Sequence, residues 1–196
     1  DQVISATATV VDTQGQLAAA SSNGFSGDSE WTSARMTGSV TLRGEGDSRP
    51  DGYYSARAIH MSDLPRAREV GTKALERATA RLGAIQGPTR RTTMIVEPRN
   101  AVSLIARLLR PANAESVSQE RSYFRSSLGE RLFSESLTIT DEPLIARGLG
   151  SRHFDREGIS ARSIPIIEAG RASNIYVDTY YGRKIDMPPT TGSASN

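Results

Sequence analysis

Four side chains with chemically active groups lie close together in a stretch bounded by glycines at 148 and 170. They are Ser151, His153, Asp155 and Glu157. His153 and Asp155 alternate along what reads as an extended segment, so their side chains can face the same way, and Glu157 can join them. An imidazole with two carboxylates is a ligand set that zinc accepts. The same groups can instead form a hydrogen-bonded loop, and this is the interpretation that the sequence favours.

The spacings that define known catalytic sites are absent. His60 and His153 are the chain's two histidines, and neither belongs to an H-E-x-x-H pair, in which two imidazoles would converge on one zinc ion. Gly150-Ser151-Arg152 lacks the second glycine of a nucleophile elbow. The dinucleotide-binding pattern G-x-G-x-x-G begins at Gly148, but its third glycine position is occupied by His153. The sequence therefore predicts neither a zincin, a serine hydrolase nor a Rossmann site here.

Two carboxylate pairs and a group of tyrosines are further candidates for chemistry. Asp141 with Glu142, and Asp155 with Glu157, could do acid–base work, but carboxylates in turns usually face solvent or accept from nearby amides. The tyrosines at 176, 180 and 181 are more typical of packing than of a ligand platform. Taken alone, the residues form no catalytic constellation.

Composition excludes several broad classes of protein. The 196 residues suffice for one large or two small domains, and 37% of them are hydrophobic with no run of membrane-spanning length. Absence of cysteine excludes a disulfide framework and fits a reducing cytosol. The net charge of +2 and the scattered arginines give no basic stripe for nucleic acid. We expect a soluble segment from inside a longer protein.

The first half of the chain predicts an antiparallel β meander followed by a helix. Alternation and turn signals place strands at 4–11, 16–20, 31–43 and 53–60, with turns at 12–15 and 21–24 and a further break at 27–28. Met36, Val40 and Leu42 share one strand face. Residues 62–82 carry a helical stripe that includes Val70, Ala74 and Ala78, with the N-cap at Ser62 or Asp63. Glycine and proline at 87–88 then mark a domain boundary.

The second half predicts a strand–helix–helix–strand region and a hairpin. A β-branched run at 92–96 is typical of a buried strand, and 101–110 and 115–128 follow as helices, the second capped by Gly129. Residues 132–139 alternate as a strand, and a turn follows at 140–143. A hairpin is expected from 164–168 and 174–178, turning at Ala169-Gly170. The predicted fold class is therefore α+β.

Several short motifs follow one another along the chain. They are Leu137-Thr-Ile-Thr-Asp-Glu-Pro143, Gly148-Leu-Gly-Ser151, Phe154-Asp-Arg-Glu-Gly158, Ile166-Ile-Glu-Ala-Gly170 and Tyr180-Tyr-x-Arg-Lys184, with Ser22-Asn-Gly-Phe25 and Ser55-Ala-Arg57 earlier. Together they resemble the TldD/PmbA family, named for modulation of DNA gyrase and associated with peptide-processing metalloproteases. The resemblance is most specific from residue 137 onward and extends over nearly the whole chain.

The resemblance also implies which branch of the family this chain is similar to. Metal-bearing TldD members carry H-E-x-x-x-H in the helix after the first strand of the C-terminal domain. Here that helix, at 101–110, reads AVSLIARLLR and has no histidine and no acid. The chain therefore looks like the PmbA branch, also called TldE, whose members pair with TldD. No catalytic residue, metal ligand or cofactor is expected in this chain, and zinc is expected in the partner.

From this resemblance we expect a central α+β domain at 1–87 and the first, truncated part of a C-terminal TldD/PmbA domain at 88–196. The expected partners are a TldD-like metal-bearing paralogue and an unfolded peptide in the cytoplasm, with a homodimer possible, and neither nucleic acid nor a membrane. An independent peptide- or protein-binding scaffold without protease activity is the alternative, and an autonomous hydrolase using the 151–157 loop is a third. Contact with peptide or partner is expected from Ser151, His153, Asp155 and Glu157.

Overall fold

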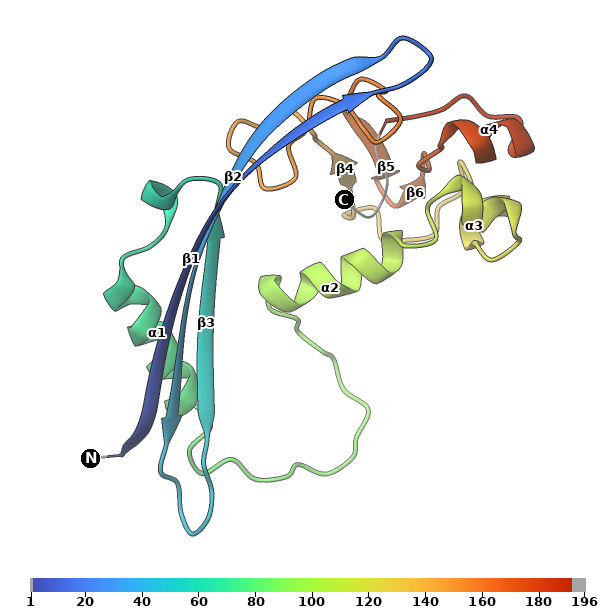
Figure 1. Cartoon of the computed structure of the whole chain (residues 1–196). Coiled ribbons are helices and arrows are strands. Elements are labelled where there is room, and N and C mark those ends of the chain that lie inside the picture. The colour runs from blue at the N-terminus through green and yellow to red at the C-terminus, as the bar shows by residue number, and fades with distance from the viewer. Residues whose placement is uncertain (1, 192–196) are drawn as a thin grey trace. The chain divides into compact units, whose positions relative to one another are not determined.

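A computed structural model describes residues 2–191 and shows the predicted α+β fold class (Figure 1). Two compact units can be distinguished. The first contains residues up to Ala18 together with Asp28–Thr92, and the second contains Ala19–Gly27 together with the chain from Thr93 onward. The tip of the first β-hairpin thus belongs to the second unit. In the described part of the chain, no helix is both long and apolar enough to cross a membrane.

Unit 1 is built on a three-stranded antiparallel sheet in the order β1-β2-β3. Its elements are β1 (Val3–Ala20), β2 (Ser26–Leu42), β3 (Asp51–Ala58), a 3₁₀ turn η1 (Met61–Asp63) and α1 (Ala67–Thr79). β1 and β2 continue without a break through the segments predicted as turns at 12–15 and 27–28, so those two predictions are wrong. The predicted turn at 21–24 is confirmed, where Asn23 Oδ1 accepts from the Phe25 N–H at 3.1 Å.

The core of unit 1 lies between α1 and one sheet face, and its residues are small. The predicted shared face of β2 is confirmed: Val40 and Leu42 are buried and Met36 is half-buried. Opposite them lie Ala74 and Ala78, each 0% exposed, from the predicted helical stripe. Helix and sheet approach closely because Gly52 faces α1 without a side chain; a Cβ there would lie 2.3 Å from the Ala78 nitrogen.

The start of α1 differs from prediction. The helix begins at Ala67, after a separate 3₁₀ turn, and its N-cap is Arg66, which makes no side-chain cap. Ser62 and Asp63 lie within the earlier turn, where the His60 imidazole accepts from the Ser62 N–H. Local hydrogen bonding by these polar side chains stabilises a tight turn in competition with the helix.

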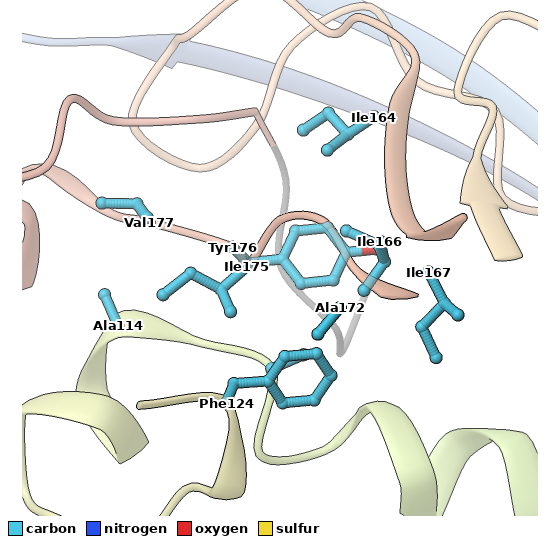
Figure 2. Close-up of a cluster of buried hydrophobic side chains, with 10 residues drawn as sticks. Ala114, Phe124, Ile164, Ile166, Ile167, Ala172, Ile175, Tyr176 and Val177 are labelled. Atoms are coloured by element: carbon cyan, nitrogen blue, oxygen red, sulfur yellow. The ribbon is translucent and has the colours of Figure 1, made fainter. Parts of the chain in front are cut away.

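Unit 2 has short elements around a large apolar cluster. They are α2 (Pro98–Leu109), α3 (Ala114–Ser118), η2 (Tyr123–Ser126), β4 (Ile139–Asp141), β5 (Ile164–Glu168), β6 (Arg171–Ala172) and α4 (Thr179–Ile185). β4, β5 and β6 form an antiparallel sheet in that order. Figure 2 shows the cluster, in which Phe124, Ile166, Ile167 and Ile175 are each 0% exposed.

Three predicted elements of unit 2 are wrong. Residues 92–96 form no strand, because no other strand of the described chain pairs with them. Met94 and Ile95 are accordingly 74% and 94% exposed. The helix predicted at 115–128 ends after α3, where Glu120 adopts a left-handed conformation with φ 58°. Of the strand predicted at 132–139 only its last residue lies in β4, although Phe133 and Leu137 do pack against the cluster.

The C-terminal hairpin turns where predicted but pairs with a different register. Ala169 and Gly170 have φ of 46° and 78° and join β5 directly to β6, pairing Glu168 with Arg171. Two consecutive residues with positive φ match the twist of a two-residue hairpin turn. The segment predicted as the return strand, 174–178, lies outside β6 and makes one isolated bridge from Tyr176 to Asn113. The second strand is therefore shorter than predicted.

Candidate functional site

A loop between β4 and β5 carries the four predicted contact residues, and a half-buried ion pair lies at its base. Arg152 Nη2 lies 2.6 Å from Asp141 Oδ2, and Nη1 lies 3.3 Å from Asp141 Oδ1. Their side chains are only 14% and 16% exposed. The Arg152 N–H also donates to the Pro143 carbonyl at 2.9 Å. This two-point contact fixes where the loop returns to the sheet.

Tyr176 adjoins the same ion pair and is 7% exposed. Burial raises the pKa of Tyr176 to about 12, with a further increase from the Asp141 charge and its hydrogen bond, partly opposed by Arg152. Arg152 Nε is buried and has no hydrogen-bond partner among residues 2–191. Asp141, Arg152 and Tyr176 thus form a desolvated polar group at the base of the loop. Sequence reasoning did not single out Arg152, because its partner Asp141 lies 11 residues earlier and no local pattern joins the two.

Ser151 closes the first turn of the loop. Its Oγ donates to the Ile145 carbonyl at 2.6 Å, and its N–H donates to the Gly148 carbonyl at 3.1 Å. A hydroxyl that donates to a main-chain carbonyl is not oriented as a nucleophile toward a base. The serine therefore holds the loop conformation.

Asp155 and Gly158 shape the second turn. Asp155 Oδ1 accepts from the N–H groups of Glu157 and Ile159, both at 2.9 Å. Gly158 has φ 80°, and the Phe25 ring occupies the space where a side chain at this position would lie. The Phe25 and Phe154 rings meet edge to face at 5.1 Å. An aromatic pair thus joins the tip of the β1–β2 hairpin to the loop.

Glu157 connects the loop to the start of α4. Its Oε2 accepts from the Thr179 N–H at 2.8 Å and from the Thr179 hydroxyl at 2.9 Å. Asp178 Oδ1 accepts from the Tyr181 N–H at 2.6 Å, as an N-cap does. Two carboxylates therefore satisfy the first turn of α4, where negative charge is favourable. Alongside α4 lies an open pocket of about 470 Å³, lined partly by Thr179, Gly182 and Arg183.

His153 differs from the other three predicted contact residues. It is exposed, and no hydrogen bond from its imidazole is found within residues 2–191, while its carbonyl accepts from Ala161. The side chains of Ser151, Asp155 and Glu157 thus form hydrogen bonds that hold the loop, whereas the His153 imidazole faces solvent. The hydrogen-bonded loop that the sequence favours is confirmed, because the carboxylates of Asp155 and Glu157 accept from main-chain N–H groups.

The resemblance described above places α2 at the position of the metal-bearing helix of TldD members. α2 reads PRNAVSLIARLL, without histidine or carboxylate, and begins with Pro98 in its first turn. Leu108 and Leu109 pack on the apolar cluster, while Val102 is 68% exposed. Over residues 2–191, no three His, Cys, Asp or Glu side chains are grouped so as to hold a metal ion. The residues present here do not fit a metal site.

The tyrosines near the C-terminal end fall into two environments. Tyr176 packs in the core cluster, whereas Tyr180 is 60% exposed and meets Tyr181 edge to face at 4.9 Å. Lys184 Nζ lies 4.5 Å from the Tyr180 ring centroid and 5.4 Å from that of Tyr181. A hydrogen bond with Tyr180 raises the pKa of Lys184. This cluster has the geometry of a cation–π contact on the surface of α4.

Comparisons with known proteins agree with this architecture. Residues 1–82 match the family model described as PmbA/TldA metallopeptidase central domain, and residues 89–196 match its C-terminal domain. The Metalloprotease PmbA homolog of Buchnera aphidicola subsp. Baizongia pistaciae is 29% identical over 83% of this chain and 36% of the relative. Metalloprotease PmbA of Escherichia coli O157:H7 is 28% identical over 79% of this chain and 34% of the relative. The chain thus spans about a third of the length of these relatives.

Solved structures place the fold in the same group. A Bacteroides thetaiotaomicron protein named as a modulator of DNA gyrase superposes with a TM-score of 0.91 at 32% identity, over 99% of this chain and 44% of that one. TldE of Thermococcus kodakarensis, at 19% identity, shares the fold with a TM-score of 0.72, over 93% of this chain and 41% of that one. Because the two family matches together extend over nearly all of its residues, the chain belongs to the PmbA/TldD metallopeptidase family.

Proposed function

We propose that this chain is part of a PmbA/TldE-like subunit that pairs with a TldD-like metalloprotease and shapes the channel for an unfolded peptide. Membership in the metallopeptidase family and the PmbA-named relatives support a role in proteolysis. The observation that carries the choice of subunit is α2, which offers no zinc ligand where TldD members have theirs. The partner would therefore supply zinc and the general base.

The two edges of the unit 1 sheet differ in a way that supports peptide binding. On β3, Arg77 Nη1 donates to the Tyr53 carbonyl at 2.7 Å and Arg81 Nη1 donates to the Asp51 carbonyl at 2.9 Å. Arg77 of α1 and Arg81, which follows the helix, thus occupy main-chain acceptors of that edge strand. A covered edge is protected from pairing with another chain.

The opposite edge is open in the described part of the chain. β1 pairs only with β2 there, and all of its residues except Gly15 and Ala19 are exposed. A long strand with free main-chain groups can bind an extended peptide through hydrogen bonds that do not depend on sequence. In this proposal, β1 is the strand along which the unfolded peptide lies.

The predicted contact residues fit this role with one distinction. Ser151, Asp155 and Glu157 maintain the loop, so their contribution to binding is indirect. His153 presents an exposed imidazole that can touch a peptide or the partner directly. Replacement of His153 by alanine should therefore weaken association without destabilising the fold.

The subunit assignment is tested with the full-length protein and its paralogue bearing H-E-x-x-x-H. Zinc content and peptide hydrolysis are measured for each protein alone and for the mixture. The expected result is one zinc ion per pair and hydrolysis only when the paralogue is present. Stoichiometric zinc and hydrolysis by the isolated protein would refute the metal-free role. Failure of the two proteins to associate would favour the independent scaffold.

The role of the β1 edge is tested by site-specific crosslinking within the same pair. The chain has no cysteine, so a single introduced thiol reports one position without background. Thr9→Cys on β1 and Thr72→Cys on α1 are both at exposed positions. A peptide with a thiol-reactive group should label the β1 variant more than the α1 variant. Equal labelling, or labelling of the partner alone, would exclude strand addition at β1.

A further inference from the structure

Two arginines lie directly opposite each other on neighbouring strands of unit 1. The antiparallel register pairs Arg35 of β2 with Arg57 of β3. Like charges in directly opposed positions destabilise a sheet. No ion pair to either guanidinium occurs within residues 2–191. The fold therefore holds two positive charges together with no internal compensation.

Strand alternation places this pair on the sheet face away from α1. Gly38, Val40 and Leu42 face the helix, as their burial and the contact of Gly38 with Val70 show. Odd-numbered residues of β2 therefore point to the opposite side. Both Arg35 and Arg57 are exposed there. The charges face solvent rather than the core.

Neighbouring hydroxyl groups orient one guanidinium and leave its outer nitrogens available. Arg57 Nε donates to Ser33 Oγ at 3.2 Å, which directs the side chain along the sheet surface. In the adjacent pair, Thr37 and Ser55 satisfy each other through their hydroxyls at 2.9 Å. The Arg57 Nη groups remain available beside Arg35. Two adjacent guanidiniums can hold one carboxylate by charge-assisted hydrogen bonds.

An aromatic side chain lies on the same face of β2, four residues before Arg35. Trp31 precedes Ser33 by two residues and so shares its face; it is 49% exposed and lies over Gly15 of β1. Tryptophan and arginine are enriched at protein–protein interfaces because they offer contact area and directional donors together. We call Trp31, Ser33, Arg35 and Arg57 the arginine-pair patch.

We propose that the arginine-pair patch binds a carboxylate of an acidic peptide segment. The argument for this occupant is charge complementarity: one carboxylate accepts from both guanidiniums and removes their repulsion. Two arginines make a site for a single carboxylate, whereas nucleic acid is recognised by a longer basic stripe. The proposal rests on the proposed function in taking a polypeptide as ligand, and it adds a preference for acidic residues.

The chain contains a built-in reporter for the experiment. Trp31 is its only tryptophan, so intrinsic fluorescence reports directly on the patch. The full chain is titrated with a peptide of alternating glycine and glutamate, and with the same peptide carrying glutamine. The acidic peptide should change Trp31 emission and bind more weakly as salt rises. Equal binding of both peptides would overturn the proposal.

Variants separate carboxylate binding from general charge. Arg35→Gln and Arg57→Gln should each weaken binding about tenfold, the effect of losing one charge-assisted contact. Arg68→Gln is the matched control, since Arg68 is an exposed arginine on α1 and its substitution should leave binding unchanged. An equal loss in all three variants would indicate nonspecific attraction and contradict the patch.

Measuring the unfolding midpoint of each variant distinguishes a loss of binding from a loss of folding. Because the pair repels itself, Arg35→Gln should leave the unfolding midpoint unchanged or raise it. Weaker binding then cannot be attributed to unfolding. An oligonucleotide that binds the patch more tightly than the acidic peptide would refute the choice of ligand. Zinc content and hydrolysis of the protease pair are measured separately, so the patch and the proposed function can fail independently.

Discussion

The two units of this chain are stabilised in different ways. Unit 1 has long regular elements and a core of small residues, in which α1 approaches the sheet closely over Gly52. Unit 2 has a core of large residues, such as Phe124 and Ile166, but its three strands contain only 3, 5 and 2 residues. Many of its main-chain groups are therefore satisfied by turns and side chains. The stability of unit 1 therefore depends on the close packing of the α1 backbone against the sheet. The stability of unit 2 depends on individual polar contacts.

The largest effect on this contrast is expected from removing the half-buried guanidinium of Arg152 in unit 2. Arg152→Ala leaves the Asp141 carboxylate desolvated without its partner, and we expect a loss of about 3 kcal/mol in the free energy of unfolding. The equivalent change in unit 1, Arg81→Ala, breaks an ion pair with Asp51 whose side chains are 55% and 65% exposed. That loss should stay below about 1 kcal/mol.

Urea unfolding followed by two probes distinguishes the units. Trp31 fluorescence reports on unit 1, and far-ultraviolet circular dichroism reports on both. As a control, Arg152→Met combined with Asp141→Ala removes both charges and should recover much of the loss. Equal destabilisation by Arg152→Ala and Arg81→Ala would show that the Asp141–Arg152 ion pair stabilises the fold no more than the exposed Asp51–Arg81 pair.

A smaller loss in the free energy of unfolding is expected when a side chain is added where α1 lies close to the sheet in unit 1. In Gly52→Ala the new Cβ would lie 2.3 Å from the Ala78 nitrogen and 2.5 Å from the Ala74 carbonyl oxygen. These are backbone atoms, so α1 must shift, and we expect a loss of about 2 kcal/mol from overpacking. The measurement is the urea midpoint reported by Trp31.

Gly71→Ala is the matched control within the helix itself. An added Cβ at Gly71 meets nothing within 4 Å. Alanine there should stabilise unit 1 by about 0.5–1 kcal/mol because it restricts the unfolded chain. If Gly52→Ala were as harmless as Gly71→Ala, backbone fit would not limit the stability of this unit.

The same contrast explains which elements could be predicted from sequence. In α1, Val70, Ala74 and Ala78 follow the helical period, and the helix buries these three residues. In unit 2, apolar content predicted a strand at 92–96, but such a run indicates only a tendency to be buried and does not supply a pairing strand. The left-handed Glu120 that ends α3 carries no sequence signal comparable with a glycine.

A polar loop ahead of the strand at 164–168 was predicted and is present, but the contacts of its side chains could not be deduced from the sequence. Its polar residues stood out because glycines surround them. Ser151 donates to Ile145, 6 residues away, and Glu157 accepts from Thr179, 22 residues away. Pairings at such distances depend on the tertiary fold rather than on any local pattern. The role of Arg152 could not be predicted for the same reason, because its partner Asp141 lies 11 residues earlier.

The last prediction concerns pH and tests the polar group at the base of the loop. The pKa of Tyr176 is raised to about 12 in the folded chain from an ordinary value of 10.0, chiefly by burial and then by the Asp141 charge. The native state thus holds the phenolic proton more tightly than the unfolded state. The resulting stability is fully present below pH 10 and is lost as the pH rises toward 12.

Tyr176→Phe has no proton to lose at this position, so it isolates the contribution. The difference in unfolding free energy between wild type and Tyr176→Phe should shrink by about 1 kcal/mol between neutral pH and pH 11. Urea unfolding at several pH values measures it, and Tyr53→Phe in unit 1 controls for loss of a hydroxyl. Parallel pH profiles for wild type and Tyr176→Phe would mean that Tyr176 is solvated, and the ion pair beside it would then contribute no more than a surface pair.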